Sequence, residues 1–281
     1  ITRIAVEYAT TKPAMLKQGY GMQRRAYGEQ PVLAGCALAV ITGNVGIPGG
    51  WASGFGLQAD DGGPLWNIFP TGENPVKSRI PVFLWTEAIL RGKEMDKSDG
   101  IQGVEKLDND LKMIWSVASN ILINQHSNVN RTIKILKDES LVEFIIVQDQ
   151  FMTPSAKFAD LVLPVATQFE TWGAEDGWRY GDEVLFMPKI LDAEIEVKSD
   201  YQICSEIAEE LGLKDKFTEG KSEKDWIDWS LNHYRETRYP GTPDLESFVK
   251  SNQGVHTIKV DKPKIAFEDF RKDPGKFPLN T

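Results

Sequence analysis

Cysteine and histidine are scarce in this chain of 281 residues. It has two cysteines, Cys36 and Cys204, and three histidines, at positions 126, 233 and 256. The cysteines lie far apart in apolar, helix-like segments, and neither belongs to a CxxC pair, so we predict buried free thiols. Zinc and iron–sulfur centres need several such ligands at close spacing. We therefore predict no metal site and no iron–sulfur cluster within this chain.

Long hydrophobic runs are also missing. No stretch reaches the roughly 20 apolar residues that a membrane-spanning helix requires. The first residues show no secretory signal pattern. We expect no direct membrane insertion by these residues. The sequence opens on Ile1 rather than Met, which favours an internal cut in a longer polypeptide.

Positive charge is in deficit: 32 Lys and Arg face 41 Asp and Glu, for a net charge of −9. A polyanion would be repelled overall, so we predict no nucleic-acid partner. Three common site motifs are missing as well, namely GxSxG, GxxxxGK and a GxGxxG after a strand. Their absence argues against a hydrolase elbow, a P-loop and an ordinary dinucleotide fold.

What is present is the pattern of a globular α/β protein. The composition is 41% hydrophobic and 26% charged, which is typical of folded domains. The centre reads as strand 111–116, polar loop 120–130, helix 131–138, strand 143–147 and strand 160–163. Because strands of a parallel sheet are buried on both faces, such apolar runs predict a Rossmann-like parallel sheet.

The flanks complete the expected organisation. We predict an α/β domain over residues 1–175, with an irregular loop over 49–81, and a mostly helical extension over 176–281 that could pack on the same domain. The further elements expected are helices at 1–10, 30–41, 154–158, 201–211 and 223–235, helical pieces near Leu245 and Phe267, a strand at 14–16 and a flexible turn at 19–21.

Three polar loops could form a ligand site: Gln18–Gln30, Asn120–Arg131 and Gln148–Ser155. In parallel α/β sheets, ligands bind outside the carboxyl ends of the strands. Arginines in the first two loops could pair with phosphates. The alternative is an ordinary polar surface, in which Asp149 caps a turn and His126 is a hydrogen-bonding surface histidine.

Longer segments of the sequence that include these loops resemble segments of a known protein family. Residues 19–30 (GYGMQRRAYGEQ) and 42–50 (TGNVGIPGG) resemble a segment shared by molybdopterin oxidoreductases of the dimethyl sulfoxide reductase family. Residues 120–132 (NILINQHSNVNRT) resemble a later segment of the catalytic subunits of its anaerobic dimethyl sulfoxide reductase branch. Residues 148–164 are similar to the family phrase QDxFxTxTAxxADxVLP, with Ser155 in place of the second threonine. The resemblance runs in order through nearly the whole chain and weakens after about residue 235.

The resemblance implies a cofactor and a set of residues that hold it. Members of the family bind molybdenum between two molybdopterin guanine dinucleotides, and their Rossmann-like third domain contributes strand-end loops to one dinucleotide. Asp149 is then the candidate for the amino edge of guanine, since a carboxylate accepts from N–H groups. The implied cofactor-binding residues are Gly19, Gly21, Met22, Gln23 and Arg24 near the pterin or its phosphate, and Asn120, Asn124, His126, Arg131, Gln148, Asp149 and Thr153 along the nucleotide.

The resemblance also implies what lies outside this chain. The serine that ligates the metal and the iron–sulfur region are expected upstream, so we predict no catalytic residue here and no activity of this piece alone. The implied parent reduces an S-oxide or N-oxide similar to dimethyl sulfoxide. Its implied partners are an iron–sulfur electron-transfer subunit and a membrane anchor subunit, at the periplasmic side or outer face of the cytoplasmic membrane.

Two alternatives stay open at this point. One is another molybdopterin branch, such as formate dehydrogenase or a nitrate, selenate, tetrathionate or polysulfide reductase, although Gln125-His126-Ser127 and Gly28-Glu29-Gln30 favour the oxide reductases. The other is a stand-alone nucleotide-binding module, which the missing GxGxxG disfavours.

Overall fold

A computed structural model describes residues 1–52, 69–176, 183–193, 196–237, 239–251, 254–257 and 265–277. The chain divides into two compact units that interleave along the sequence. The first comprises residues 1–68, 174–186 and 231–281, and the second comprises 69–173 and 187–230. The chain passes from one unit to the other after residues 68, 173, 186 and 230. The change after 173 falls near the division predicted after residue 175, and the other three were not predicted.

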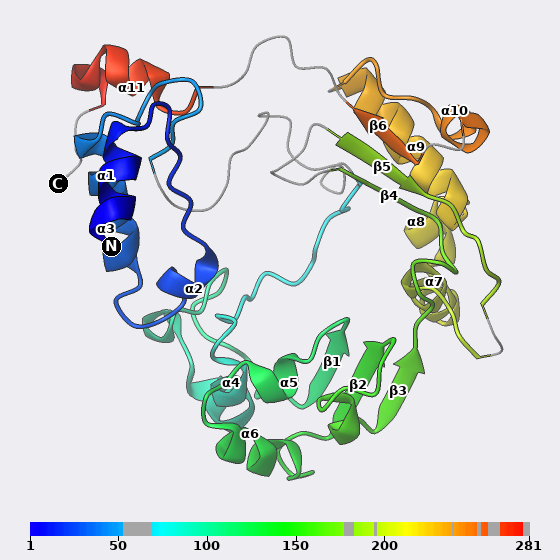
Figure 1. Ribbon diagram of the computed structural model, residues 1–281. Coiled ribbons are helices and arrows are strands. Elements are labelled where there is room, and N and C mark those ends of the chain that lie inside the picture. Colours follow the sequence, from blue (N-terminus) through cyan, green and yellow to red (C-terminus); the bar gives the residue numbers. More distant parts are fainter. Residues whose placement is uncertain are drawn as a thin grey trace. The chain divides into compact units, whose positions relative to one another are not determined.

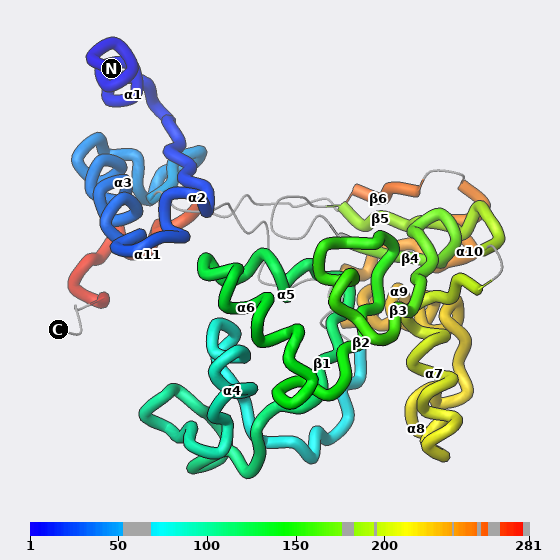
Figure 2. The backbone as a smooth tube through the Cα atoms, turned by 90° about the horizontal axis from the view of Figure 1, so that it is seen from below, coloured from blue at the N-terminus to red at the C-terminus, as the bar shows by residue number. Residues whose placement is uncertain are grey.

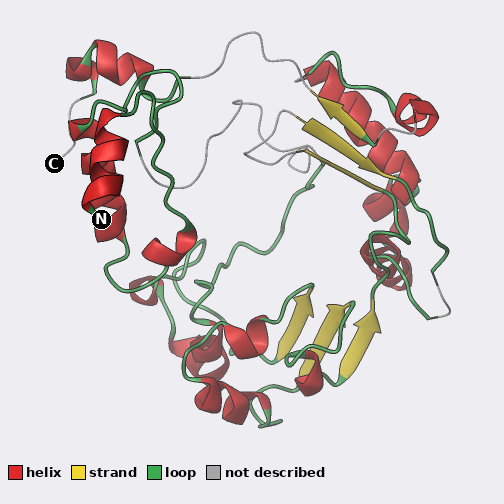
Figure 3. Ribbon diagram, viewed as in Figure 1, coloured by secondary structure: helices red, strands yellow, loops and turns green. Residues whose placement is uncertain are grey.

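The second unit is built on a parallel sheet. Its strands are β1 (Met113–Val117), β2 (Phe144–Asp149) and β3 (Leu161–Pro164), paired in parallel in the order β1-β2-β3. The three arrows point the same way in Figure 3. The predicted α/β fold with a parallel sheet is therefore confirmed.

Strand β2 is central because its apolar run is buried on both faces, as such strands are in parallel sheets. On one face, Ile145 and Val147 pack against three short helices, which lie together beside the sheet in Figure 1. These helices are α4 (Trp85–Arg91), α5 (Ile121–Asn124) and α6 (Val129–Leu136). Helix α4 was not predicted, and the expectation of a plain loop over 120–130 was wrong, since α5 and the start of α6 lie there.

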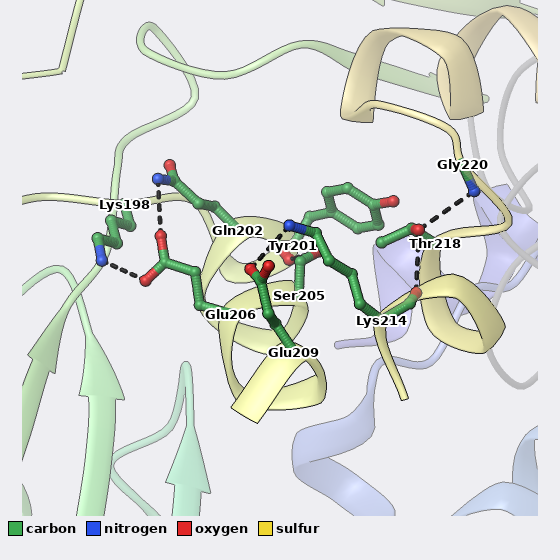
Figure 4. A network of polar contacts seen from close by, with 9 residues as sticks. All are labelled: Lys198, Tyr201, Gln202, Ser205, Glu206, Glu209, Lys214, Thr218 and Gly220. Atoms are coloured by element: carbon green, nitrogen blue, oxygen red, sulfur yellow. Dashed lines mark hydrogen bonds and ion pairs between the residues drawn. The ribbon is translucent and has the colours of Figure 1, made fainter. Parts of the chain in front are cut away.

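The remaining helices of this unit follow the sheet. Helix α7 (Asp200–Glu210) begins where Ser199 Oγ accepts from the backbone N–H of Gln202 at 3.2 Å. Helix α8 (Lys214–Thr218) lies beside α7 in Figure 2. In Figure 4, Lys214 Nζ of α8 meets Glu209 Oε2 of α7 at 2.7 Å and so links the two helices. The Glu206 carboxylate of α7 pairs with Lys198, which precedes that helix. Helix α9 (Glu223–Thr237) comes next, with residues 223–230 in this unit and 231–237 in the first. The predicted helices at 201–211 and 223–235 are confirmed. Single turns complete the unit: η2 (Gly92–Glu94), η3 (Lys97–Asp99) and η4 (Ala156–Phe158).

The first unit is mostly helical. Its helices are α1 (Thr2–Thr10), α2 (Tyr20–Gln23), α3 (Glu29–Ile41), α10 (Leu245–Ser251) and α11 (Glu268–Lys272), followed by the turn η5 (Pro274–Lys276). The predicted helices at 1–10 and 30–41, and the helical pieces near Leu245 and Phe267, are confirmed.

A second sheet accompanies these helices and was not predicted. It has the order β4-β5-β6, with β4 (Gly173–Asp176), β5 (Glu183–Met187) and β6 (Val255–Thr257), and β5 pairs antiparallel with β6. The extension over 176–281 is thus mostly helical, as expected, but also contributes strands.

The strand predicted at 14–16 was wrong. These residues belong to neither a helix nor a strand. The backbone N–H of Ala14 donates instead to the side-chain oxygen of fully buried Asn44 at 3.1 Å. The predicted flexible turn at 19–21 instead opens helix α2.

Of the irregular loop predicted over 49–81, residues 53–68 lie outside the described residues. The remainder contains neither helix nor strand, apart from one isolated bridge between Arg79 and Gln102. Both cysteines are free, as predicted, but half-buried rather than buried. Within the described ranges, every helix falls short of the length and apolar character needed to cross a membrane.

Candidate functional site

The carboxyl ends of the three parallel strands share one edge of the sheet. Val117 lies opposite Gln148, and Asp149 lies opposite Pro164. The loops that follow β1 and β2 therefore start side by side. An edge of this kind is where α/β sheets bind their ligands.

Asn120 joins those two loops. Its side-chain oxygen Oδ1 accepts hydrogen bonds from the backbone N–H of Ser155 at 2.9 Å and from Ser155 Oγ at 2.8 Å. Ser155 is fully buried, so both of its donors depend on this partner. The predicted site residue Asn120 thus positions the loops at the edge.

Asp149 ends strand β2 and is half-buried. Its Oδ1 accepts from the backbone N–H of Phe151 at 3.0 Å, which is the turn-capping role considered as the alternative. Its second oxygen, Oδ2, faces no hydrogen-bond donor from the described part of the chain. Because an ionised carboxylate accepts with both oxygens, Asp149 can cap the turn and still receive an N–H group from a ligand.

Thr153 shapes the same loop. Its Oγ1 accepts from the backbone N–H of Ala156 at 3.1 Å and so begins the turn η4. Between Asp149 and Thr153, the side chains of Phe151 and Met152 are 72% and 64% exposed. The edge therefore combines one carboxylate with two large apolar side chains, a combination suited to a flat ring that carries N–H groups.

Gln148 faces the interior instead. It is buried, its Oε1 accepts from Trp115 Nε1 at 3.2 Å, and its Nε2 donates to Asp200 Oδ1. Successive residues of a strand point to opposite faces, so Gln148 and its neighbour Asp149 take different roles. Gln148 ties the sheet to the start of helix α7.

The predicted site residue His126 has a buried ring nitrogen. Its ring packs against Trp85, with ring centroids 5.3 Å apart, while Trp85 Nε1 donates to Gln125 Oε1 at 2.8 Å. The Nε2 atom of His126 is buried, and none of the described residues offers it a hydrogen bond. Buried polar atoms are nearly always paired, so this nitrogen is a place where a ligand group or a water would be expected.

Arg131 and Asn124 belong to the same stretch of chain and are exposed. The guanidinium Nη2 of Arg131 meets Glu87 Oε1 at 2.6 Å, and Glu87 Oε2 lies 3.6 Å from Arg91 Nε. A guanidinium has five N–H donors, so Arg131 retains donors for an anion while Glu87 fixes its position.

The predicted residues Gly19, Gly21, Met22, Gln23 and Arg24 belong to the first unit. Met22, Gln23 and Arg24 are exposed, and the Arg24 guanidinium stacks 4.5 Å from the centroid of the Tyr20 ring. Together with α3, this segment lines a pocket of about 520 Å³, whose walls are Gln18, Gly19, Tyr20, Gln23, Glu29, Val32 and Leu33.

The glycine that this turn requires is Gly28 rather than Gly19 or Gly21. A Cβ atom at Gly28 would lie 1.8 Å from the carbonyl oxygen of Gln23, whereas at Gly19 and Gly21 it would meet nothing within 4 Å.

The structure thus brings together the predicted residues that follow β1 and β2. The sequence did not single out Trp85, Glu87 or the buried partner Ser155. Trp85 and Glu87 come from helix α4, about 40 residues before the loops that they contact, and no local pattern marks them.

Comparison with known proteins identifies similar sequences. The family described as molybdopterin oxidoreductase matches residues 4–210. The dimethyl sulfoxide reductase DmsA of Haemophilus influenzae is 41% identical over 100% of this chain and 35% of its own length, and that of Escherichia coli is 40% identical over 100% and 34%. The biotin sulfoxide reductase of Cereibacter sphaeroides is 30% identical over 95% of this chain and 36% of its own. The chain therefore spans about a third of the length of the curated relatives it matches. Among solved structures, acetylene hydratase from Pelobacter acetylenicus is 21% identical in sequence, and the alignment covers 64% of this chain and 21% of the hydratase chain. Its TM-score of 0.46 is too low to inform the function.

Proposed function

This chain belongs to the molybdopterin oxidoreductase family, and from that premise we propose that its sheet edge holds the guanine end of a molybdopterin guanine dinucleotide. Asp149 would accept the N–H groups of guanine through Oδ2. His126 and Arg131 would meet the ribose and diphosphate, with Asn120 and Thr153 shaping the loops.

The residues at this edge fit such a group. The single observation that carries the proposal is the buried Nε2 of His126, which lacks a partner among the described residues. Arg131, which has spare donors, contacts the same helix α4 as His126 does. A guanine base adds N–H groups for Asp149, and a diphosphate adds charge for Arg131. Gln148 would act indirectly, through Trp115 and Asp200.

We assign the segment of the first unit to the pterin end of a dinucleotide. Gly19, Gly21, Met22, Gln23 and Arg24 would border it, because the exposed Arg24 guanidinium and the adjoining pocket offer a cation beside an aromatic wall. The domain assignment proposed from the sequence, a dinucleotide-binding part over 1–175 and an extension over 176–281, is retained for the parent protein.

When bound, molybdenum and its dithiolene ligands would supply the redox chemistry. This chain's residues bind and orient the organic part. For the whole protein we propose the reduction of an S-oxide or N-oxide, since its relatives are named as dimethyl sulfoxide, biotin sulfoxide and trimethylamine-N-oxide reductases. An upstream metal ligand and iron–sulfur cluster, an iron–sulfur partner subunit, a membrane anchor subunit and a position at the outer face of the membrane belong to the same proposal.

Titration of the 281-residue chain with GMP and with AMP tests the assignment of the guanine end. We expect GMP to bind more tightly, because guanine presents its N1–H and 2-amino groups side by side to a carboxylate, whereas adenine has only its 6-amino group. Asp149→Asn keeps the turn but removes the charge, and should weaken GMP binding about tenfold, the usual scale for a charge-assisted hydrogen bond. Asp108→Asn, an exposed residue outside the edge, is the matched control. Equal affinities for GMP and AMP, or no effect of Asp149→Asn, would refute the assignment.

A further inference from the structure

A second pocket lies in the second unit, which contains the parallel sheet, and it is lined by aromatic rings. It has a volume of about 340 Å³ and lies where Trp172 and the chain around Phe69 meet helices α7, α8 and α9. Its walls are Phe69, Pro70, Trp172, Tyr201, Phe217, Glu223, Trp226 and Ile227. No part of the proposed cofactor site uses these residues.

The polar tips of the rings are already engaged with the protein. Tyr201 OH donates to the backbone oxygen of Lys221 at 2.6 Å, and Trp226 Nε1 donates to Tyr201 OH at 3.1 Å. The rings therefore offer a ligand their faces rather than their hydrogen-bonding groups. An aromatic face carries negative electrostatic potential.

Glu223 is the one charged side chain among the wall residues. It is half-buried, and hydrogen bonds from Ser199 and from the backbone N–H of Trp172 hold its carboxylate. It lies in the first turn of α9, where a negative charge is favourable. The pocket thus combines aromatic faces with one fixed carboxylate.

The protein's own ammonium groups already use these rings. Lys221 Nζ lies 4.3 Å from the centroid of a Trp226 ring, and Lys224 Nζ lies 4.9 Å from that of Trp172. Residues 219–228 carry four carboxylates and only these two lysines. The surroundings of the pocket are therefore negative overall, which disfavours an anionic ligand.

We propose that this pocket binds a compact organic cation of the alkylammonium class, with its N-methyl groups against the rings and Glu223 as its counter-charge. Aromatic walls around a single carboxylate are the arrangement by which proteins recognise quaternary ammonium groups. An uncharged ligand of the same shape would gain the contact with the rings but neither the cation–π attraction nor the ion pair.

Choline and its uncharged analogue 3,3-dimethyl-1-butanol test this directly, because the two differ in charge and hardly in shape. We expect the 281-residue chain, titrated by calorimetry, to bind choline about tenfold more tightly than the alcohol. Glu223→Gln should reduce that preference severalfold, because it removes the ion pair and leaves only the cation–π attraction of the rings. Asp228→Asn, which removes a carboxylate of the same helix that does not line the pocket, should leave it unchanged.

Trp172→Leu provides a second variant that removes a ring without touching the charge, and it should weaken choline binding severalfold. Circular dichroism establishes that each variant is folded. Equal binding of choline and the alcohol, no binding of choline at tens of millimolar, or a preference that Glu223→Gln leaves undiminished would overturn the proposal.

Discussion

A single oxygen atom of Asn120 accepts both the backbone N–H and the hydroxyl of Ser155, 35 positions later in the chain. Asn120 follows strand β1 and Ser155 follows strand β2, so this contact fixes the distance between the two loops at the candidate site. Since Ser155 is fully buried, neither donor can turn to water instead.

Removal of this contact should destabilise the fold. Asn120→Ala leaves two buried donors of Ser155 unpaired, and we expect a loss of about 1–3 kcal/mol in the free energy of unfolding. Asn124→Ala, at the exposed end of helix α5, should change it by less than about 0.5 kcal/mol. Urea denaturation measures both values, and equal losses would show that the contact contributes nothing.

A charge at position 148 should be poorly tolerated. Gln148→Glu places a buried carboxylate against Asp200, and we expect a loss of about 3 kcal/mol or more at neutral pH. Burial and the like charge would raise the pKa of the new carboxyl in the folded state, so the deficit relative to wild type should shrink as the pH falls from that raised pKa to the ordinary value of about 4.3. Below about 4 the part of the deficit that is due to charge should be gone. Gln102→Glu, at an exposed position, serves as control. A deficit independent of pH would mean that shape rather than charge is responsible.

Glu223 should make the stability of the chain depend on pH in the opposite sense to acids such as Asp96 and Asp99, whose pKa values are lowered by hydrogen bonds. Burial raises the pKa of Glu223 above its ordinary value of 4.5, although hydrogen bonds from Ser199 and Trp172 oppose the shift. A raised pKa in the folded state means that ionisation favours unfolding above the ordinary pKa. Glu223→Gln should therefore be slightly more stable than wild type at pH 7, with a gain that disappears below pH 4.5. Thermal unfolding between pH 4 and 8 measures the gain, and a gain that grows on acidification would contradict this account.

Arg131 should make binding sensitive to phosphate. If its free N–H donors meet the diphosphate, the chain should bind GDP severalfold more tightly than GMP at low salt, and the difference should fall as salt is added. Arg131→Gln should remove the preference for GDP. Lys134→Gln, which removes an exposed charge from the same helix, should preserve it. Isothermal titration gives the affinities of all three proteins for GDP and GMP, and a preference retained in Arg131→Gln would exclude this residue from the phosphate site.

The sequence was sufficient to predict the elements whose structure follows from the pattern of neighbouring residues. The apolar run Phe144–Val147 predicted the central strand, and the amphipathic run that begins at Tyr201 predicted α7. The polar residues after β1 and β2 could be placed at one edge because parallel strands end together. The alternation along β2 could also have separated the inward Gln148 from the outward Asp149.

The sequence pattern failed to predict elements whose structure depends on contacts with residues far away in the chain. Strand β5 exists because it pairs with β6, about 70 residues later, and three-residue strands carry almost no signal of their own. Ala14–Leu16 had a strand-like composition but gained no partner strand in the described structure. The contacts of Trp85 and Glu87 with the loop at 125–131 arise only once helix α4 has packed on the sheet.

The most direct test of the central claim is the cofactor content of the whole protein that contains this chain. Elemental analysis for molybdenum, with GMP released by acid hydrolysis, should give both in wild type. It should give markedly less of both in a variant that combines Asp149→Ala with Arg131→Ala, while Asp108→Ala combined with Lys134→Ala should match wild type. A doubly substituted edge that retains full molybdenum and GMP, in a protein whose folding is intact, would contradict the account.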